Sequence, residues 1–464
     1  MAENKTLDQG YELPEIDLTK YQREPFILPE DEDVTPEIIE KFIEQHQLRL
    51  PRYEQLRKEY ENEAPILGMK KPDFKPNNKL VVGYPGLLVN TLEGYFSGIA
   101  PKVSHEDERI DDRLKVFKTL NHFGDVFAEV SKKASIYGHA YTVNYQDYRG
   151  RTRIAPARPQ EGFVVYDDTI GEEPILGVLY QHDDEGKLKG TLYTYKDETP
   201  IFSTEDGLQF GEPVPHFFDE VPIVEWIHNE ERLSLIETVL TLIHALNKTV
   251  SEKANDVDYF ADAYLKILGV KLNKDDLKDV RDLRIMNFKG DGSGEKPEVG
   301  FIDKPSGDNS QENLLDRLER LIHKISMIPD VSSEEFAQAA SGRSLEFKLL
   351  SMSNLANTKE RKFRKSLQKV FEMWFNVPTQ VPGGMQHEWI NLEYTFIRNS
   401  PQNVLEEIKA AQEAVGLLSH ESRLSMISRV DDPKQEIEKL ESERHDEFQA
   451  NDPYQSLGQL DGGE

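Results

Sequence analysis

Cysteine is missing from this chain altogether, and so are long apolar runs. Without cysteine there can be no disulfide, no thiolate nucleophile and no cysteine-bound zinc. No apolar run approaches the roughly 18 residues of a membrane-spanning helix, and residues 1–20 lack the basic start and apolar stretch of a secretory signal. We therefore expect a soluble protein that folds inside a cell, with no membrane as a partner.

Positive charge is also scarce. The 464 residues include 85 Asp and Glu against 56 Lys and Arg, a formal net charge of −29. Proteins that grip nucleic acid release counterions through basic side chains, so this balance argues against tight, static DNA binding. The ends are the most acidic parts, with 12 acids and 3 bases in residues 1–40 and 11 acids and 3 bases in residues 431–464. Both ends are expected to be solvated and weakly ordered.

Several signatures of catalysis are missing as well. The chain has no GxxxxGK[ST] phosphate loop, no HExxH and no GxSxG, so an ATPase of the P-loop type is excluded. The acidic pairs Asp167-Asp168 and Asp183-Asp184 could hold a divalent cation. One pair ends a predicted strand and the other lies in a predicted turn, where acids are common in any case. We expect no catalytic residue, no cofactor and no metal.

What the chain does have begins with an α+β body over residues 1–230. Helices are predicted from Thr35-Pro36, from Pro51, and over residues 85–96 and 106–137, the last with a break at Gly124. Short β-branched and aromatic runs then predict one antiparallel meander. These runs cover residues 140–145, 162–166, 175–180 and 188–195.

A helix, an insert and a second helix come next. Residues 231–265 have an unbroken helical pattern, which predicts a rod of roughly 50 Å. The second helix is predicted from Asp308 or Ser310 to Pro329, with the apolar row Leu314, Leu318, Leu321 and Ile325. Short strands are predicted in the insert at residues 266–270, 283–288 and 298–302. Taken alone, the apolar face of each helix is typical of a helix packed in a protein core. The order of helix, insert and helix is typical of a subunit of a ring.

The second helix is followed by an acidic Ser/Ala/Gly loop, residues 330–342, and by a helix predicted over residues 343–375. Between Lys359 and Lys369 this helix holds six bases and one acid. They form either a solvated helix face or a contact with phosphate or a neighbouring subunit. The residues concerned are Arg361, Lys362, Lys365 and Lys369. A short strand over 389–396 and a helical region from Ser400-Pro401 to about residue 447 complete the pattern.

Several stretches of sequence carry a resemblance to a known family. They are LPRYEQLRKEYENEAPIL, KPNNKLVVGYPGLLVNTLEGYFSG, ASIYGHAYTVNYQDYRGRTR, FVVYDDT and VPIVEWIHNEERLSLIETVLTLIHALNKTVSEKANDVDYFADAYLKILG. Over roughly residues 51–442 the chain resembles the portal proteins of tailed bacteriophages that infect Gram-positive hosts. KPNNKLV and SEKANDVDYFADAYL are too long for chance similarity, although no single residue in them explains a chemistry.

The resemblance implies an α+β portal fold with a wing, a two-helix stem, a small α/β clip, a tunnel loop with a long following helix, and a helical crown. The implied divisions are an acidic arm (1–40), the wing (41–228), the outgoing stem helix (229–264), the clip (265–305), the returning stem helix (306–329), the tunnel loop (330–342), the long helix (343–397), the crown (398–447) and an acidic tail (448–464).

The resemblance also implies a function and partners. The copies would form a ring of roughly twelve, or thirteen, subunits at the portal vertex of the virion, assembled in the host cytoplasm. Double-stranded DNA would pass through the channel, and the implied partners are the terminase large subunit, a head-to-tail adaptor, and the major capsid and scaffolding proteins. The implied channel residues are Ser332, Ser333, Glu334, Glu335, Phe336 and Gln338. The implied docking residues of the clip are Leu283, Ile285, Phe288, Val299 and Phe301.

Two other classes of function remain open at the level of sequence. The first is a metal-dependent DNA-processing enzyme that uses the paired acids at 167–168 and 183–184. The second is a structural adaptor without a channel, which would not need two long helices joined by a small insert. An enzyme of this kind could act as a monomer, whereas a portal protein must assemble.

Overall fold

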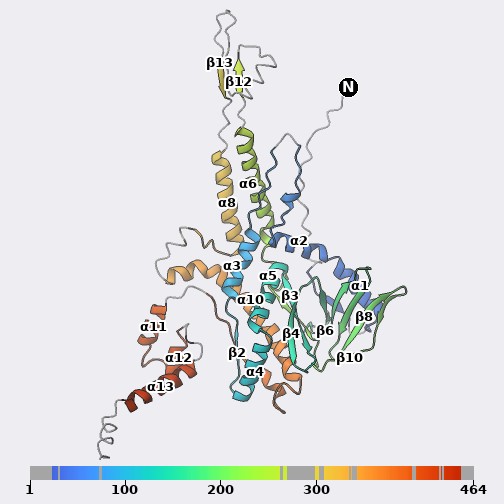
Figure 1. Ribbon diagram of the computed structural model, residues 1–464, viewed down its shortest axis with the longest axis vertical. Helices are drawn as coiled ribbons and strands as arrows, with labels where there is room; N and C mark the ends of the chain where they lie inside the picture. Colours follow the sequence, from blue (N-terminus) through green and yellow to red (C-terminus); the bar gives the residue numbers. More distant parts are fainter. Residues whose placement is uncertain are drawn as a thin grey trace, which may run out of the picture. The chain divides into compact units, whose positions relative to one another are not determined.

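The computed structural model of the chain describes residues 23–29, 32–72, 76–261, 265–268, 298–301, 308–333, 336, 342–399, 404–427, 430 and 433–450 (Figure 1). The chain divides into two compact units. The first comprises residues 1–330 and 349–398, and the second comprises residues 331–348 and 399–464. No helix among the described residues combines the length and the apolar character needed to cross a bilayer.

The largest sheet of the first unit has seven strands in the order β1-β5-β6-β7-β8-β10, with β9 paired to β8. The strands are β1 (Phe26–Leu28), β5 (Gly162–Asp167), β6 (Pro174–His182), β7 (Leu188–Tyr193), β8 (Asp197–Thr204), β9 (Gly207–Phe210) and β10 (Val214–Pro215). The pairs from β5 to β8 are antiparallel, which confirms the predicted meander for three of its four runs. The short β1 adds to its edge in parallel with β5.

The fourth predicted run lies in a different sheet. Strand β3 (His139–Gln146) is the middle strand of a three-stranded sheet, between β11 (Ile223–Ile227) and β4 (Thr152–Ala157). The single meander predicted from sequence was therefore wrong at this point. The physical reason is that β11 comes about eighty residues later in the chain, and a local sequence pattern does not reveal a distant strand partner.

The two faces of β5 supply two cores. Phe163 and Val165 pack with Phe42 of α1 (Pro36–Gln47) and with Phe26 of β1. Val164, one residue out of phase, packs against the three-stranded sheet. This alternation is the two-residue period of a strand buried on both faces. Since Phe26 and Leu28 are buried, the expected acidic arm 1–40 includes a strand and the first turn of α1 as parts of the core, while residues 1–22 lie outside the described part.

A layer of helices completes the first unit. The helices are α2 (Leu50–Tyr60), η2 (Pro65–Gly68), α3 (Tyr84–Phe96), α4 (Glu108–Leu120), α5 (Phe123–Tyr137), η3 (Glu237–Val239), α6 (Leu240–Ala261), α8 (Asp308–Ser326), α10 (Gly342–Asn376) from Leu349 onward, and η4 (Gln386–Asn391). Thr35 caps α1 as predicted, by accepting a hydrogen bond from the amide of Ile38. The break before α5 lies at His122, in a left-handed conformation, and not at Gly124 as predicted.

Two small sheets complete the strands. In the insert between α6 and α8, β12 (Leu265–Leu268) pairs with β13 (Glu298–Phe301). These two strands confirm two of the three strands predicted in the insert. The third, 283–288, lies outside the described residues. Strand β14 (Glu393–Thr395) pairs with β2 (Lys102–Ser104), and residues 389–391, the start of the run predicted as a strand, belong to η4 instead.

The first predicted rod differs most from the structure. Residues 231–236 form turns, the helical part begins at Glu237, and α6 has 22 residues, or about 33 Å, instead of roughly 50 Å. Arg232 has a φ of 51°, which turns the chain out of the helical path. Ser234 and Glu237 then start the helix together, because Glu237 accepts from the Ser234 amide and the Ser234 hydroxyl accepts from the Ile236 amide.

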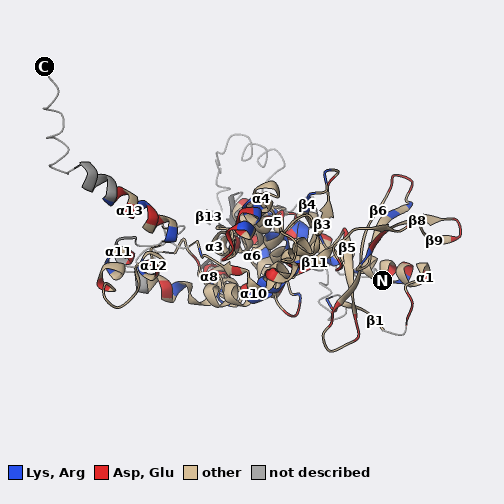
Figure 2. Ribbon diagram, turned by 90° about the horizontal axis from the view of Figure 1, so that it is seen from below, with Lys and Arg blue, Asp and Glu red and all other residues tan. Residues whose placement is uncertain are grey.

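The second unit contains three further helices, which are α11 (Val404–Glu413), α12 (His420–Leu424) and α13 (Pro433–Ala450). They confirm the helical region predicted up to about residue 447, although as separate pieces, and residues 400–403 lie outside the described part. Acidic and basic side chains are interspersed along residues 433–444 of α13, as Figure 2 shows. Such a mixed, charged surface is typical of a solvated helix.

Candidate functional site: the paired helices and the long helix

The helices α6 and α8 lie side by side and antiparallel (Figure 1). Gln311, in the first turn of α8, donates to Asp256 near the end of α6, while η3 at the start of α6 also packs on α8. Leu318 and Ile322 of α8 are buried, and Lys253 of α6 forms an ion pair with Glu312 of α8. The predicted arrangement of two helices joined by an insert is therefore present.

A buried ion pair anchors η3, at the start of α6, to α2. The guanidinium of Arg52 donates to both carboxylate oxygens of Glu237 at 2.7 Å, and the two side chains are 4% and 1% exposed. The remaining donors of Arg52 reach the carbonyls of Tyr137 and Arg232, both at 3.2 Å. Because every charge has a partner, this pair can fix the position of η3 without leaving a buried charge uncompensated.

A second contact between α2 and α6 lies two helical turns further on. Nε2 of His244 lies 2.7 Å from Oε1 of Glu59, and both side chains are almost fully buried. Arg52 and Glu59 are seven residues apart on α2, and Glu237 and His244 are seven apart along the other helix. The two helices therefore meet through one matched row of polar side chains.

The apolar row of α8 is only partly covered by the described residues of the chain. Leu314 and Ile325 are each 46% exposed, although they belong to the apolar row predicted from sequence. The predicted row is thus only partly covered: Leu318 is buried inside the chain and Leu321 is half-buried, while Leu314 and Ile325 at the ends of the row are exposed. An apolar row that one chain covers only in part can be completed by a partner.

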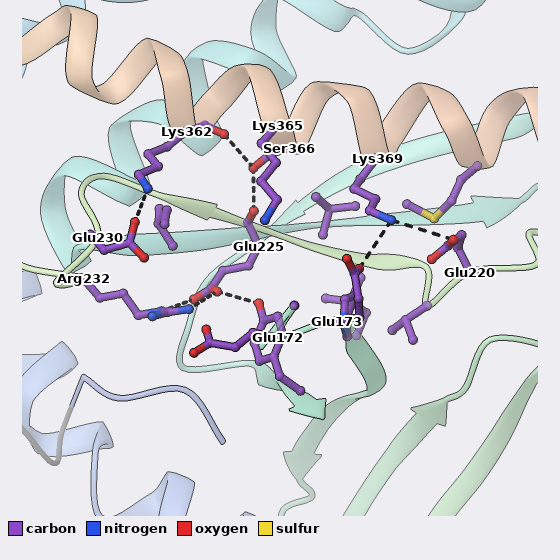
Figure 3. Close-up of a pocket in the computed structure, with 18 of the residues that line it drawn as sticks. Glu172, Glu173, Glu220, Glu225, Glu230, Arg232, Lys362, Lys365, Ser366 and Lys369 are labelled. Atoms are coloured by element: carbon purple, nitrogen blue, oxygen red, sulfur yellow. Dashed lines mark hydrogen bonds and ion pairs between the residues drawn. The ribbon is translucent and has the colours of Figure 1, made fainter. Parts of the chain in front are cut away.

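Three lysines of α10 point toward acidic side chains around a pocket of about 400 Å³ (Figure 3). Lys362 forms an ion pair with Glu230, and Lys369 lies 3.4 Å from Glu372, 3.7 Å from Glu173 and 3.8 Å from Glu220. Lys365 lines the pocket without an ion pair to any described residue. Arg361 is exposed and donates to Thr358. Two of the four predicted contact residues, Lys362 and Lys369, therefore form ion pairs within the chain.

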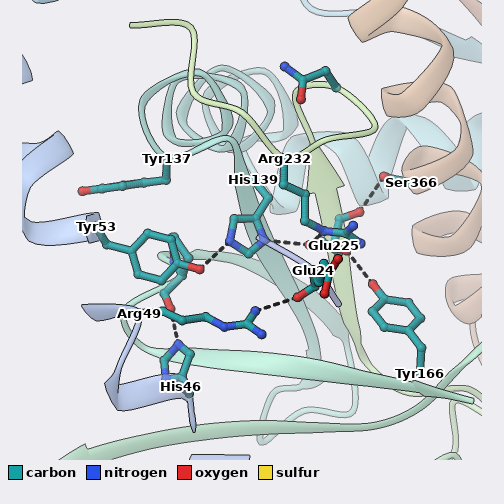
Figure 4. Close-up of polar contacts among 12 residues, drawn as sticks. Glu24, His46, Arg49, Tyr53, Tyr137, His139, Tyr166, Glu225, Arg232 and Ser366 are labelled. Atoms are coloured by element: carbon teal, nitrogen blue, oxygen red, sulfur yellow. Dashed lines mark hydrogen bonds and ion pairs between the residues drawn. The ribbon is translucent and has the colours of Figure 1, made fainter. Parts of the chain in front are cut away.

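The wall of this pocket is stabilised by a network around Glu225 of β11 (Figure 4). Its carboxylate accepts from Arg232 at 2.7 and 2.8 Å, from Nδ1 of His139 at 2.6 Å and from the Tyr166 hydroxyl at 2.6 Å. Burial alone would raise the pKa of Glu225, but Arg232 and these donors hold it well below its usual range. A carboxylate with four donors serves to hold strands together, because it has no lone pair left to act on a substrate.

The same network defines the state of His139. Burial lowers the pKa of His139, against the opposing effect of Glu225, so the ring is neutral. Its Nδ1–H donates to Glu225, and Nε2 accepts from the hydroxyl of Tyr53 at 2.9 Å. Ser366 of α10 adds a hydrogen bond to the carbonyl of Glu225 at 2.7 Å, which ties the long helix to β11.

The paired acids of the enzyme hypothesis serve as turn residues. Asp167 accepts from the amides of Thr169 and Glu173, and Asp183 accepts from the amides of Glu185 and Lys187. Within the described part of the chain, no group of three or more His, Asp or Glu side chains is arranged to hold a metal ion. The hypothesis of a metal-dependent DNA-processing enzyme thus receives no support.

The predicted channel and docking residues are only partly covered by the structure. Glu334, Glu335 and Gln338, with Leu283, Ile285 and Phe288, lie outside the described residues. Ser332 and Ser333 form a turn, and Phe336 donates its amide to Ser333, with Lys348 lying 5.9 Å from its ring. In the insert, the backbone of Val299 pairs with Ile267 and that of Phe301 with Leu265.

Comparison with known proteins identifies the family. Residues 39–450 match the family described as "Phage portal protein, SPP1 Gp6-like". The chain belongs to this portal protein family. The predicted α+β portal fold is therefore confirmed at the level of the family and of its mixed helices and strands.

Two curated portal proteins are similar to this member of the family. The portal protein of Bacillus phage SPP1 is 24% identical over 410 residues, which are 82% of this chain and 79% of that protein. The portal protein of Clostridium phage phiCD119 is 23% identical over 283 residues, which are 58% of this chain and 60% of that protein. Both matches agree with the resemblance to phages of Gram-positive hosts.

Sequence reasoning missed the anchors that position the paired helices in this portal protein. The sequence predicted a helix that contains Arg52 and Glu59 but no partners for these side chains. In the structure Arg52 binds Glu237 and Glu59 binds His244. A signal for the helix start was present: Ser234-Leu235-Ile236-Glu237 is a capping-box sequence, which predicts a helix beginning at this point and not at residue 231. The charged partners themselves had no local signal, because they are 185 residues apart.

Proposed function

We propose that copies of this chain close side by side into a ring of roughly twelve, or thirteen, subunits, with a channel for double-stranded DNA. The observation that carries the proposal is the incompletely covered apolar face of α8, with Leu314 and Ile325 exposed while Leu318 packs within the chain. A neighbouring copy would supply the missing partner for that face. Membership of the portal family gives this assembly its purpose, namely packaging and release of phage DNA.

In this assembly the parts take the roles that the family resemblance implies. Residues 41–228 form the wing, α6 (within 229–264) and α8 (within 306–329) form the stem, and 265–305, with β12 and β13, form the clip. The tunnel loop is 330–342, and α10 (within 343–397) is the long helix after it. The crown is 398–447, with 1–40 and 448–464 as the acidic ends.

The net charge of −29 supports a passage that guides DNA without binding it. Phosphates held by basic side chains would pin the duplex, whereas acidic walls discourage such contacts. We assign the channel contact to Ser332, Ser333, Glu334, Glu335, Phe336 and Gln338 of the loop. Lys365 and Arg361 of α10, which have no ion pair to described residues, are the basic side chains left for a neighbouring subunit or for phosphate.

The partners and the location follow from the same proposal. With no phosphate loop in the sequence, the energy for packaging comes from a separate terminase, docked on the clip through Leu283, Ile285, Phe288, Val299 and Phe301. A head-to-tail adaptor occupies this end after packaging. The ring assembles in the host cytoplasm with the scaffolding and major capsid proteins, and remains in the virion. The chain itself performs no catalysis.

The test is the size and shape of the purified full-length protein. We expect an assembly many times the mass of one chain by light scattering, and rings with a central hole in averaged end-on electron micrographs. Leu314→Glu is expected to shift the protein to smaller species, because a charge replaces an apolar contact between copies. Asn313→Glu places the same charge on the neighbouring exposed position and should leave the assembly intact. A monomeric wild-type protein under all conditions would contradict the proposal.

The loop assignment has its own experiment. Deletion of residues 332–340 is expected to leave the rings intact and to reduce DNA packaging, because the loop lines the channel and does not hold subunits together. Neutralising Glu334 and Glu335 to Gln should alter packaging velocity or yield. Unchanged packaging after both changes would contradict the loop assignment, and loss of rings after the deletion would show that the loop is part of the subunit interface.

A further inference from the structure

The helix α6 carries a buried polar stripe in addition to its apolar one. His244, Asn247, Ser251 and Asn255 follow each other at intervals of three, four and four residues, so they share one face of the helix. They are 4%, 1%, 0% and 5% exposed. Burying polar groups is unfavourable unless each finds a hydrogen-bond partner, so the stripe needs a polar surface opposite it.

The partner is an extended segment that precedes α3. We call residues 76–83 the strap. The amide of Asn78 donates to Oδ1 of Asn255 at 2.6 Å, the amide of Leu80 to Oγ of Ser251 at 2.9 Å, and the amide of Val82 to Oδ1 of Asn247 at 2.8 Å. Alternate amides of the strap therefore face α6, which is the two-residue pattern of an extended chain.

The spacings of the two elements match. Two residues of extended chain span about 6.6 Å, and four residues of an α-helix rise about 6 Å. Three successive amides of the strap can thus meet three successive turns of α6 with little strain. Contacts at the edges extend the row: Lys71 pairs with Glu252 at 2.8 Å, and the side-chain amide of Asn78 donates to Asp258.

The matched row also limits movement. If α6 slid by one helical turn toward the Asn78 end of the strap, the amide of Val82 would face Ile243. The side chain of Ile243 has no hydrogen-bond acceptor. One buried amide would then lose its partner, at the same time as the edge contacts of Lys71 and Asn78. Small displacements are no better, because they misalign all three hydrogen bonds at once.

We infer that the strap is a conformational lock that holds α6 in one axial register against the α2–α3 part of the fold, and that its release or shift occurs in whole helical turns. The lock joins KPNNKLV and SEKANDVDYFADAYL, two segments that carry the family resemblance but whose residues suggest no chemistry. It rests on contacts within one chain and does not depend on ring formation.

The test uses the full-length protein and two matched pairs of variants. Leu80→Pro removes the central amide donor, whereas Leu80→Ala keeps it and only shortens an exposed side chain. Ser251→Ala removes the central acceptor, whereas Thr249→Ala removes a hydroxyl that bonds only to Ala245 of the same helix. The readout is amide hydrogen exchange resolved at residues 78, 80 and 82.

Leu80→Pro and Ser251→Ala are expected to raise exchange at the remaining strap amides together, by about tenfold, because the strap detaches as a unit. Leu80→Ala and Thr249→Ala should leave these amides protected. Equal exchange in Ser251→Ala and Thr249→Ala would overturn the inference, as would an increase at residue 80 alone. Exchange in β6 and β7 reports global unfolding and should not change in any variant.

The axial register has an independent readout, because the chain contains no cysteine. Spin labels on Asn77→Cys and Lys248→Cys, diluted with unlabelled chain, should give one distance in the wild-type background. In Ser251→Ala we expect a second distance population, displaced by about one helical turn. A single unchanged distance, or a continuous broad distribution, would contradict a lock that moves in whole turns.

Discussion

The ammonium of Lys359 lies 2.5 Å from Oε1 of Glu93, and the lysine side chain is completely buried. Glu93 belongs to α3 and also accepts from the hydroxyls of Ser97, Ser131 and Ser135. Burial opposes the charge of Glu93, but Lys359 and the hydroxyls of Ser131 and Ser135 lower its pKa below the usual range. The pair joins α3, α5 and α10 at the centre of the first unit.

Removing one partner of this pair is expected to be severe. Lys359→Met should lower the free energy of unfolding by about 3–5 kcal/mol, because it leaves Glu93 as an uncompensated buried charge. The double variant Lys359→Met with Glu93→Leu should recover a large part of that loss. Urea denaturation of the two single variants and the double variant measures the coupling. Lys365→Met, on the exposed side of the same helix, is the control and should behave like the wild type.

The anchor between Arg52 and Glu237 predicts a similar loss at the start of α6. Arg52→Ala should destabilise the protein by about 3–5 kcal/mol and speed amide exchange over residues 234–240, since Glu237 loses its buried counter-charge. Arg57, on the same helix, pairs with Glu54 and Glu61 at the surface. Arg57→Ala should therefore produce no measurable change in the denaturation midpoint. Equal effects of the two alanine variants would refute the anchoring role of Arg52.

The glycine that ends α5 predicts a steric effect. Gly138 has a φ of 92°, and a Cβ atom at this position would lie 2.0 Å from the carbonyl oxygen of Arg232. Gly138→Ala is expected to lower stability by about 3 kcal/mol or more, through backbone strain and the clash. Gly150 also has a positive φ, of 69°, but has open space around it. Gly150→Ala should lower stability by only about 1 kcal/mol. Thermal denaturation of both variants tests the difference.

His46 predicts a pH dependence of stability. Its Nε2–H donates to the carbonyl of Pro159 and its Nδ1 accepts from the hydroxyl of Tyr180. Burial, together with the nearby charge of Arg49, lowers the pKa of His46 to about 4, against the opposing effect of the Pro159 hydrogen bond. In the unfolded chain the pKa is about 6.5. The unfolded state therefore binds the extra proton over this range, and stability falls as pH falls from 6.5 to 4.

The expected loss from His46 alone is about 3 kcal/mol across that range, and it ends below pH 4, where both states are protonated. His46→Gln should be less stable at pH 7 but should show a smaller decline between pH 6.5 and 4. His387→Gln, at an exposed position, should keep the wild-type decline. The measurement is urea denaturation at half-unit intervals of pH. A decline in His46→Gln as steep as in the wild type would assign the effect to other groups, such as buried His228, whose pKa burial lowers to about 3.

Much of the architecture was accessible from local signals. The helix starts at Thr35-Pro36 and Asp308, two of the three strands of the insert and the long helix after the loop were predicted within a few residues. These signals are caps, proline positions and periodicity, which act over a few residues and so can be read without knowledge of the fold. The start of α6 was misplaced because an apolar stripe continues through a turn that Arg232 and Ser234 create.

The candidate sites were less accessible, because they depend on partners. Arg52 with Glu237 and Glu93 with Lys359 are 185 and 266 residues apart, and nothing in the local sequence pairs them. The basic stretch of α10 has the same composition whether Lys362 binds Glu230 or a phosphate, and only the fold brings Glu230 beside it.

The sequence by itself determined the cysteine-free, acidic composition, the secondary-structure periodicities and the family resemblance, all of which are properties of neighbouring residues or of totals. The tertiary structure decided which polar side chains are buried, which residues of the apolar row of α8 remain exposed, and that the strap residues bind α6. The physical reason is that burial and hydrogen bonding are settled between distant segments, where a buried polar group is stable only if the fold brings its partner to it.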